Sequence, residues 1–172
     1  RNREKERRYR QRLNHDALTG TYNRRYYDER LKNLEGRFSF AMIDMDNFKH
    51  INDRFGHQAG DAALYRAAQA IKSQIRSDDE LVRYGGDEFF LLFRDLPQQI
   101  LEKKLQSIRA ALDEIVIEEY PELHISASIG SGGAFAAGRI SRTIHRADLA
   151  MYQAKLKKDC VAIYREAKER ET

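Results

Sequence analysis

The chain has 172 residues, of which 41% are hydrophobic, and this is enough for one domain with a packed core plus an appendage. No apolar run approaches the roughly 18 residues of a membrane-spanning helix, and no secretory signal opens the chain. The one cysteine, Cys160, excludes a disulfide framework, so we expect a buried, unreactive thiol and a reducing, cytoplasmic setting.

The net charge of +4 belongs to the first twelve residues, "RNREKERRYRQR". Seven Arg or Lys against two Glu give this segment +5, and taking +5 from +4 leaves −1 for the rest of the chain. We therefore expect residues 1–14 to be a solvated helix or a linker to an upstream region that this chain lacks, since it begins at Arg1 without a methionine. A nucleic-acid-binding arm is the alternative, and the absence of a net positive charge on the rest of the chain argues against it.

Hydrophobic periodicity predicts the first elements. They are a helix at 23–34 capped by Asn23, a strand at 37–44 that ends at Asp44, a short helix at 47–55 and a long helix at 61–75. The segment "LVRYGGDEFFLLF" at 81–93 predicts a hairpin, with Gly85 and Gly86 as a two-residue turn of positive φ.

The remaining elements are a helix at 100–116, a strand at 124–130, a helix at 141–158 and a strand at 160–164. This order predicts an α/β (α+β) fold with one mainly antiparallel sheet and helices packed largely on one side, of the ferredoxin-like or polymerase-palm type. We expect residues 15–165 to form the domain and residues 166–172 a tail.

Acidic side chains stand at two strand ends of this sheet. Asp87 and Glu88 follow the glycine pair, and Asp44 ends the first long strand. If these ends lie side by side, their carboxylates form a site for Mg²⁺, which prefers oxygen ligands and leaves room for phosphate oxygens. The alternatives are a solvent-exposed acidic hairpin tip and, for Asp44, a helix cap.

Five blocks of sequence carry a resemblance. They are "DALTGTYNRR" at 16–25, "FAMIDMDNFKHINDRFGHQAGD" at 40–61, "RYGGDEF" at 83–89, "SASIG" at 126–130 and "RADLAMYQAK" at 146–155. Together they closely resemble the GGDEF family of bacterial diguanylate cyclases. The resemblance implies that two GTP molecules are condensed into cyclic di-GMP with release of two pyrophosphates, each half of a homodimer bringing one GTP.

The resemblance also implies roles for single residues. Asp44, Asp87 and the carbonyl of Met45 are then ligands of Mg²⁺ or Mn²⁺, and Glu88 is a general base or a further metal ligand. Lys49 and Lys155 hold the triphosphate, although a lysine seen alone is more often a solvated charge. The same resemblance assigns substrate contacts to Phe48, Gly85 and Gly86.

A carboxylate can accept both the N1-H and N2-H donors of guanine, and adenine lacks this pair. By resemblance Asp61 reads guanine and Asn52 assists it. Asp61 follows Gly60 at the predicted start of a long helix, so it also fits an N-cap.

Arg76 and Asp79 form an R-x-x-D pattern that five residues separate from the glycine pair of the "GGDEF" signature at 85–89. They resemble the family's product-inhibition site, although such charges are usually solvated at a helix end. Ser107 or Arg109 on the next helix is a candidate third member. A departure follows Lys155, because relatives often show Gly-Arg-Asn where this chain has "KKDC" at 157–160; Lys157 or Lys158 would replace the missing arginine as a point charge.

Two other functions stay open at the level of sequence. One is a catalytically silent receptor for GTP or cyclic di-GMP, whose usual mark is a broken acidic signature. The other is a basic interaction or nucleic-acid module, which a salt-sensitive binding assay would reveal. The intact signature favours the enzyme, and we expect it to be inhibited by its product and attached to an upstream sensor, in a cytoplasmic or membrane-attached protein.

Overall fold

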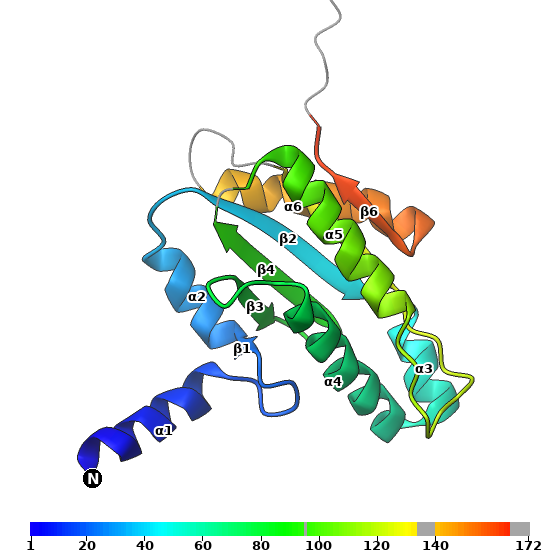
Figure 1. The fold of residues 1–172 in the computed structure, drawn as a ribbon, viewed down its shortest axis with the longest axis horizontal. Coiled ribbons are helices and arrows are strands. Elements are labelled where there is room, and N and C mark those ends of the chain that lie inside the picture. Colours follow the sequence, from blue (N-terminus) through cyan, green and yellow to red (C-terminus); the bar gives the residue numbers. More distant parts are fainter. Residues whose placement is uncertain (95, 134–139, 166–172) are drawn as a thin grey trace, which may run out of the picture.

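The computed structural model describes residues 1–94, 96–133 and 140–165. Six helices and six strands make up this part of the chain, and Figure 1 shows how they are arranged. The elements are α1 (Asn2–Asn14), β1 (Tyr22–Asn23), α2 (Arg24–Lys32), β2 (Phe38–Met45), α3 (Phe48–Phe55), α4 (His57–Ser73), β3 (Glu80–Arg83), β4 (Glu88–Arg94), α5 (Gln98–Asp113), β5 (Ala127–Ser131), α6 (Ile140–Lys157) and β6 (Cys160–Ile163).

The six strands form one sheet in the order β1-β3-β4-β2-β5-β6. β2 pairs antiparallel with both β4 and β5, and β3 pairs antiparallel with β4. The pairs β1–β3 and β5–β6 are parallel. The prediction of a mainly antiparallel sheet with surrounding helices is confirmed.

The prediction that helices pack largely on one side of the sheet is wrong. Alternate residues of β2 enter two different cores, because successive side chains of a strand point to opposite faces. Ala41, Ile43 and Met45 join a core built with α4 and α5, whereas Phe38, Phe40 and Met42 join a second core with α2 and α6. Figure 1 accordingly shows α4 and α5 on the near face of the sheet and α6 behind it.

The close packing of α6 against β5 depends on a glycine. A Cβ added at Gly130 would come within 2.8 Å of the Ala147 carbonyl oxygen, closer than side chains approach a backbone. Gly130 therefore lets the backbone of α6 lie directly on the strand. Lys155, near the end of α6, is fixed relative to the sheet by this contact.

Several boundaries differ from the sequence-based expectation, and the start of α4 differs most. α4 begins at His57, after Gly56 with φ 91°, so Asp61 lies in the second turn and is not an N-cap. The glycine supplies a break between α3 and α4 that hydrophobic periodicity does not mark. The strand expected at 124–130 begins, as β5, only at Ala127.

The hairpin between β3 and β4 is wider than expected. Residues 84–87 form the connection, and the Tyr84 amide donates to the Glu88 carbonyl at 2.9 Å. Neither Gly85 nor Gly86 has positive φ, so the prediction of a two-residue turn of positive φ is wrong. A four-residue loop can close a hairpin without the mirror-image turns that need positive φ.

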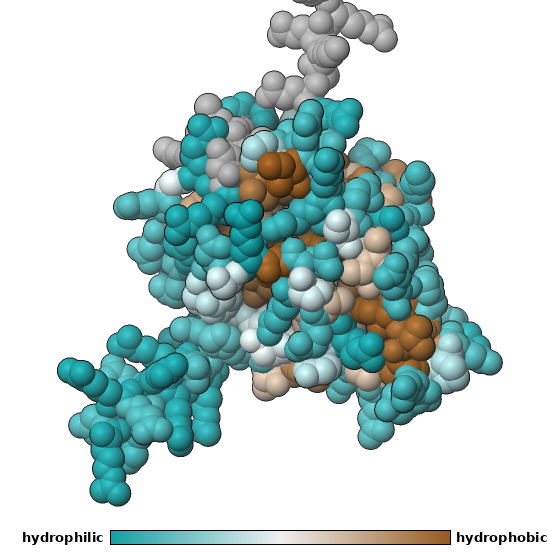
Figure 2. Space-filling model, viewed as in Figure 1, coloured by the Kyte–Doolittle hydropathy of each residue, from teal (hydrophilic) through white to brown (hydrophobic). Residues whose placement is uncertain are grey.

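The terminal segment 1–14 is a helix, α1, with no buried residue. Its charges pair along the helix, as Arg8 with Glu4 at 3.1 Å and Arg10 with Glu6 at 2.8 Å. Figure 2 shows the visible face of α1 as hydrophilic, and Figure 1 shows α1 extending away from the domain. α1 contributes little to the core and is available to a neighbouring segment or chain.

Cys160 is partly exposed, not buried as expected. Its burial is nevertheless sufficient to raise the pKa of the thiol, which favours the unreactive protonated form. No helix among the described residues is long and apolar enough to cross a membrane.

Candidate active site

The structure brings the predicted acidic residues together at one end of the sheet. Asp44, next to the last residue of β2, lies directly opposite Glu88, the first residue of β4. The next amide along β2, that of Met45, donates to the carbonyl of Asp87 at 3.1 Å. We call Asp44, Asp87 and Glu88 the acidic group. Like charges directly opposite each other destabilise a sheet, so this arrangement is costly without a bound cation.

The direction of the two carboxylates follows from strand periodicity. Asp44 lies two residues beyond Met42, and Glu88 two residues before Phe90, so both belong to the α6 side of the sheet. Lys155 of α6 reaches this position, with its Nζ 3.2 Å from Asp44 Oδ1. Met45 has the opposite parity and its side chain is buried, so only its backbone can serve the site.

Burial and the repulsion of neighbouring carboxylates raise the pKa values of Asp44 and Glu88. Burial raises the pKa of the Asp44 carboxyl, Lys155 opposes the shift, and the charge of Asp87 adds to it. Burial also raises the pKa of Glu88, reinforced by Asp44, Asp87 and the nearby Asp148. One lysine does not balance these carboxylates, which is the electrostatic condition that attracts a divalent cation.

Replacing Glu88 should stabilise the fold when no divalent ion is present. Because the folded state raises the pKa of Glu88, ionisation of Glu88 costs stability as pH rises from the unfolded-state pKa through the folded-state pKa. We expect Glu88→Gln to raise the melting temperature by about 2 °C at neutral pH in EDTA, since solvent screens part of the repulsion. Thermal melts at neutral and acidic pH test this, because the gain should vanish once Glu88 is protonated.

The donor set fits Mg²⁺ or Mn²⁺. Among the described residues no set of three or more His, Cys, Asp or Glu side chains forms a ready metal cluster. Mg²⁺ does not need one, because it keeps several waters and usually binds through one or two carboxylates plus substrate phosphates. Asp44, Asp87 and the Met45 carbonyl are the residues that could hold it, and Glu88 is a further candidate.

The residues expected to bind guanine meet where α3 packs on α4. A Cβ added at Gly60 would overlap the side-chain oxygen of Asn52 and lie 3.2 Å from Phe48 Cζ. Asp61, the residue after Gly60, is exposed beside them. Lys49 is exposed in the first turn of α3, and within the described part of the chain it has no hydrogen bond or ion pair with the acidic group.

Arg83, to which no role was assigned from the sequence, fixes the loop at 84–87 between β3 and β4. Arg83 donates through Nη2 to the Gly86 carbonyl at 2.8 Å and through Nη1 to Asp16 Oδ2 at 3.1 Å. Burial alone would raise the pKa of Asp16, but hydrogen bonds from Thr19 and Arg83 hold this pKa below its usual value. Arg83 and Asp16 both lie in sequence blocks that resemble the family, and this resemblance was the only sign of their importance in the sequence. This bridge connects the segment after α1 to the loop at 84–87, which carries Asp87.

Comparison with known proteins decides the family. The family model described as "Diguanylate cyclase, GGDEF domain" matches residues 13–159. The chain belongs to this family. The GGDEF domain is 34% identical over 152 residues to diguanylate cyclase DgcS of Shewanella oneidensis, covering 81% of this chain and 49% of DgcS. It is 34% identical over 148 residues to diguanylate cyclase DgcM of Escherichia coli K12, covering 82% of this chain and 36% of DgcM. The chain thus spans about half the length, or less, of these curated relatives.

Solved structures agree with this assignment. Diguanylate cyclase SiaD of Pseudomonas aeruginosa, in complex with its activator SiaC, matches with a TM-score of 0.81 and 31% identity over 94% of this chain and 65% of SiaD. The coiled coil and GGDEF domain of DgcB from Caulobacter crescentus, in complex with c-di-GMP, matches with a TM-score of 0.82 and 25% identity over 94% of this chain and 91% of that chain.

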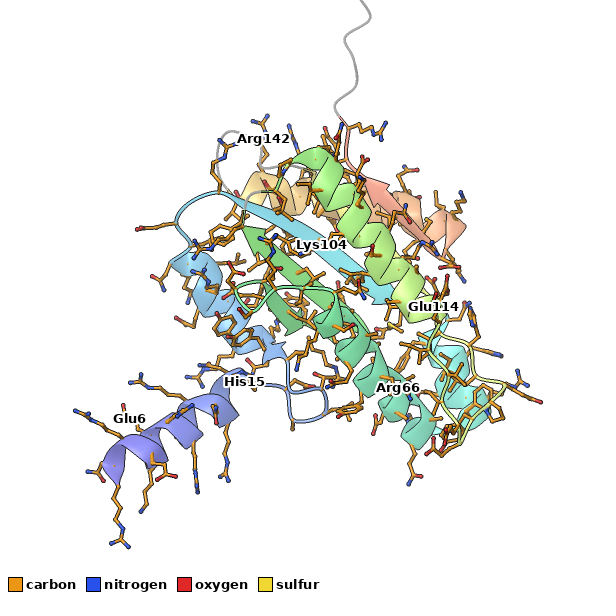
Figure 3. All side chains as sticks on the ribbon, viewed as in Figure 1. Glu6, His15, Arg66, Lys104, Glu114 and Arg142 are labelled. Atoms are coloured by element: carbon orange, nitrogen blue, oxygen red, sulfur yellow. The ribbon has the colours of Figure 1, made fainter. Side chains whose placement is uncertain are left out.

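The R-x-x-D pair lies just after α4, where the Asp79 side chain is buried and paired although Arg76 is exposed. The side chain of Asp79 is only 7% exposed; it accepts the Arg76 backbone N-H at 2.8 Å and pairs with Lys104 Nζ at 3.3 Å. Arg76 and Asp79 border a cavity of about 300 Å³. The lysine comes from α5 (Figure 3).

Neither residue considered as the third member of this region contacts Asp79. Within the described residues, Ser107 donates to the Lys103 carbonyl, and Arg109 pairs with Asp113 and Asp159. The α5 residue that reaches Asp79 is instead Lys104, one helical turn before Ser107. The sequence could not select it, because three basic residues lie within one stretch of α5.

Proposed function

We propose that this GGDEF domain is a diguanylate cyclase that condenses two GTP molecules into cyclic di-GMP and two pyrophosphates. The observation that carries the proposal is the cross-strand pairing of Asp44 with Glu88, beside Asp87. Such an acidic group is unfavourable by itself and suits a cation that also binds triphosphate. The family membership of residues 13–159 supports the same conclusion.

The proposed reaction is an attack by a ribose 3′-hydroxyl on the α-phosphorus of a second GTP. A phosphorus–oxygen bond forms to the 3′-oxygen, the bond to the β-phosphate bridging oxygen breaks, and pyrophosphate leaves; the hydroxyl proton passes to a base. Asp44, Asp87 and the Met45 carbonyl would hold a divalent ion, which when bound neutralises phosphate charge and activates the hydroxyl. Glu88, whose pKa is raised by burial and by neighbouring carboxylates, suits the base.

The other predicted residues bind and orient the substrate in this proposal. Lys49 and Lys155 stabilise the triphosphate, and the exposed backbone of Gly85 and Gly86 lets the nucleotide approach the signature loop. Asp61 accepts the guanine donors with help from Asn52, and Phe48 packs in the same pocket. The contact of Gly60 with Asn52 and Phe48 supports this grouping.

The proposal includes two further features. The product has two equivalent halves, so two domains must each present one GTP, which requires a homodimer; α1, solvated and charged, would set the pairing under control of an upstream sensory region. Arg76 and Asp79 would bind cyclic di-GMP as an inhibitor, because they border a cavity of about 300 Å³ outside the acidic group. The domain would act in the cytoplasm as part of a longer protein.

The test is incubation of the protein with GTP and Mg²⁺ or Mn²⁺, followed by mass spectrometry. We expect cyclic di-GMP and pyrophosphate in a ratio of about one to two, from the stoichiometry of the proposed reaction. Protein that binds GTP tightly but yields no product at any concentration would instead identify a receptor. Omission of the metal controls for spontaneous chemistry.

Gly60→Ala should damage guanine binding selectively. The added methyl group would overlap the side-chain oxygen of Asn52, so Asn52 must leave its position. We expect the KM for GTP to rise about tenfold with a smaller change in kcat, because the methyl disturbs substrate binding and leaves the acidic group untouched. The matched substitution Ala62→Gly, two residues further along α4, should leave KM within about twofold.

A further inference from the structure

Asp46 is a buried carboxylate to which neither the sequence nor the proposed mechanism gives a role. Its side chain is 1% exposed, although it lies only two residues after Asp44. Its oxygens accept hydrogen bonds from Ser126 Oγ at 2.8 Å, Ser128 Oγ at 2.5 Å and the backbone N-H of Asp159 at 2.8 Å. Burying a charge is costly, so we expect the reason for the burial of Asp46 to lie in the groups that it positions.

Asp46 holds one side of Lys155. The Nζ atom of this lysine lies 3.7 Å from Asp46 Oδ1 and 3.2 Å from Asp44 Oδ1, so it stands between two carboxylates. A cation bound by Asp44 would compete for that carboxylate. Asp46 then remains as the fixed negative partner that keeps the ammonium group beside the acidic group.

Asp46 also holds the chain that follows α6. Lys158 and Asp159 have φ of 60° and 44°, a left-handed backbone that residues other than glycine adopt at a cost. The hydrogen bond from the Asp159 N-H to Asp46 stabilises this reversal. As a result Lys158 points back to the start of α3, where its Nζ donates to Asn47 Oδ1 at 2.6 Å.

The two lysines thus approach the nucleotide site from one anchored segment. Lys155 lies against the acidic group, and Lys158 lies at the residue that precedes α3, whose first backbone N-H groups favour an anion. The run "KKDC" at 157–160 lacks the arginine that relatives often carry here. Both Lys157 and Lys158 are exposed, but Lys158 is held at Asn47, where it is placed to supply that positive charge.

We propose that Asp46 is a positioning residue that holds Lys155 and the segment of Lys158 against the β- and γ-phosphates of bound GTP. This inference rests on the proposed function, since it uses the same nucleotide site. It adds Lys158 as a phosphate-binding residue and Asp46 as the residue that fixes both cations.

The test measures binding without turnover. 3′-Deoxy-GTP lacks the attacking hydroxyl, and comparing its Kd with that of 3′-deoxy-GMP isolates the contribution of the β- and γ-phosphates. We expect Asp46→Asn to reduce this ratio of affinities about tenfold while the Kd for the monophosphate changes by less than about twofold. In turnover assays KM for GTP should rise more than kcat falls.

Three further substitutions keep the test decisive if Asp46→Asn fails to fold. Lys158→Ala should lower the triphosphate-to-monophosphate affinity ratio by about fivefold to tenfold, and Lys157→Ala by less than about twofold. Ser128→Ala removes one hydrogen bond to Asp46 and should give a smaller reduction in the same direction.

The outcomes separate this inference from the proposed function. If Asp46→Asn weakens binding of both ligands equally, or if Lys158→Ala and Lys157→Ala behave alike, the positioning role is wrong even when the wild type makes cyclic di-GMP. If the wild type makes no product but the affinity ratio responds as stated, the inference stands and the domain is a receptor.

Discussion

Asp87→Asn is expected to lower the rate of cyclic di-GMP formation by about 10³-fold or more while the domain remains folded. Asp87 belongs to the acidic group, and its charge contributes to raising the pKa values of both Asp44 and Glu88. Loss of one carboxylate would weaken the binding of the divalent ion that neutralises the triphosphate. This neutralisation matters most in the transition state. Product formation from GTP, quantified by chromatography at saturating Mg²⁺, measures the effect.

A surface carboxylate provides the matched control for this result. Asp78 is exposed and lies 3.8 Å from Arg94, and Asp78→Asn removes the same charge from the chain. We expect Asp78→Asn to retain activity within about twofold, as surface substitutions usually do. An Asp87→Asn protein with more than a tenth of wild-type activity would show that the acidic group does not carry the chemistry.

The second large effect concerns the pairing of two domains. If each protomer brings one GTP, specific activity should fall steeply on dilution below the dimer dissociation constant, because the active species is then a minority. Fusion of a parallel dimeric coiled coil before Arg1, in register with α1, should restore activity at low concentration by about 10²-fold, through the raised effective concentration of the partner.

The dilution experiment needs an independent measure of assembly. Analytical ultracentrifugation over the same concentration range gives the fraction of dimer, and specific activity should follow that fraction. A specific activity that stays constant into the monomeric range would contradict the requirement for two half-sites.

Five of the six strands were predictable from their short apolar runs, and the core helices from their hydrophobic periodicity, whereas β1, with only two residues, was not predicted. The distribution of helices over both faces was not, since β2 is buried on both sides and its run of apolar residues has no alternation. The start of α4 was missed because Ala59 and Gly60 extend the helix before the predicted cap at Asp61. These errors concern tertiary packing, which a local pattern does not record.

The candidate site shows the same division. The juxtaposition of Asp44 with the signature carboxylates followed from strand ends, and the structure has it in the register of β2 with β4. The role of Asp46 as a hydrogen-bond acceptor depends on Ser126, Ser128 and Asp159, which are about 80 to 113 positions away in the chain. The Lys104 partner of Asp79 likewise comes from another helix. Contacts between residues so far apart in the sequence can be identified only from the folded structure.

The most direct test of the central claim is binding of Mn²⁺ in the presence of 3′-deoxy-GTP, followed by electron paramagnetic resonance. Asp44 lies in β2 and Asp87 in the loop before β4, so a cation held jointly should be lost when either is removed. We predict that wild type and Asp78→Asn bind Mn²⁺ with similar affinity, and that Asp44→Asn and Asp87→Asn each bind it at least about tenfold more weakly. Wild-type affinity in Asp44→Asn would contradict the claim.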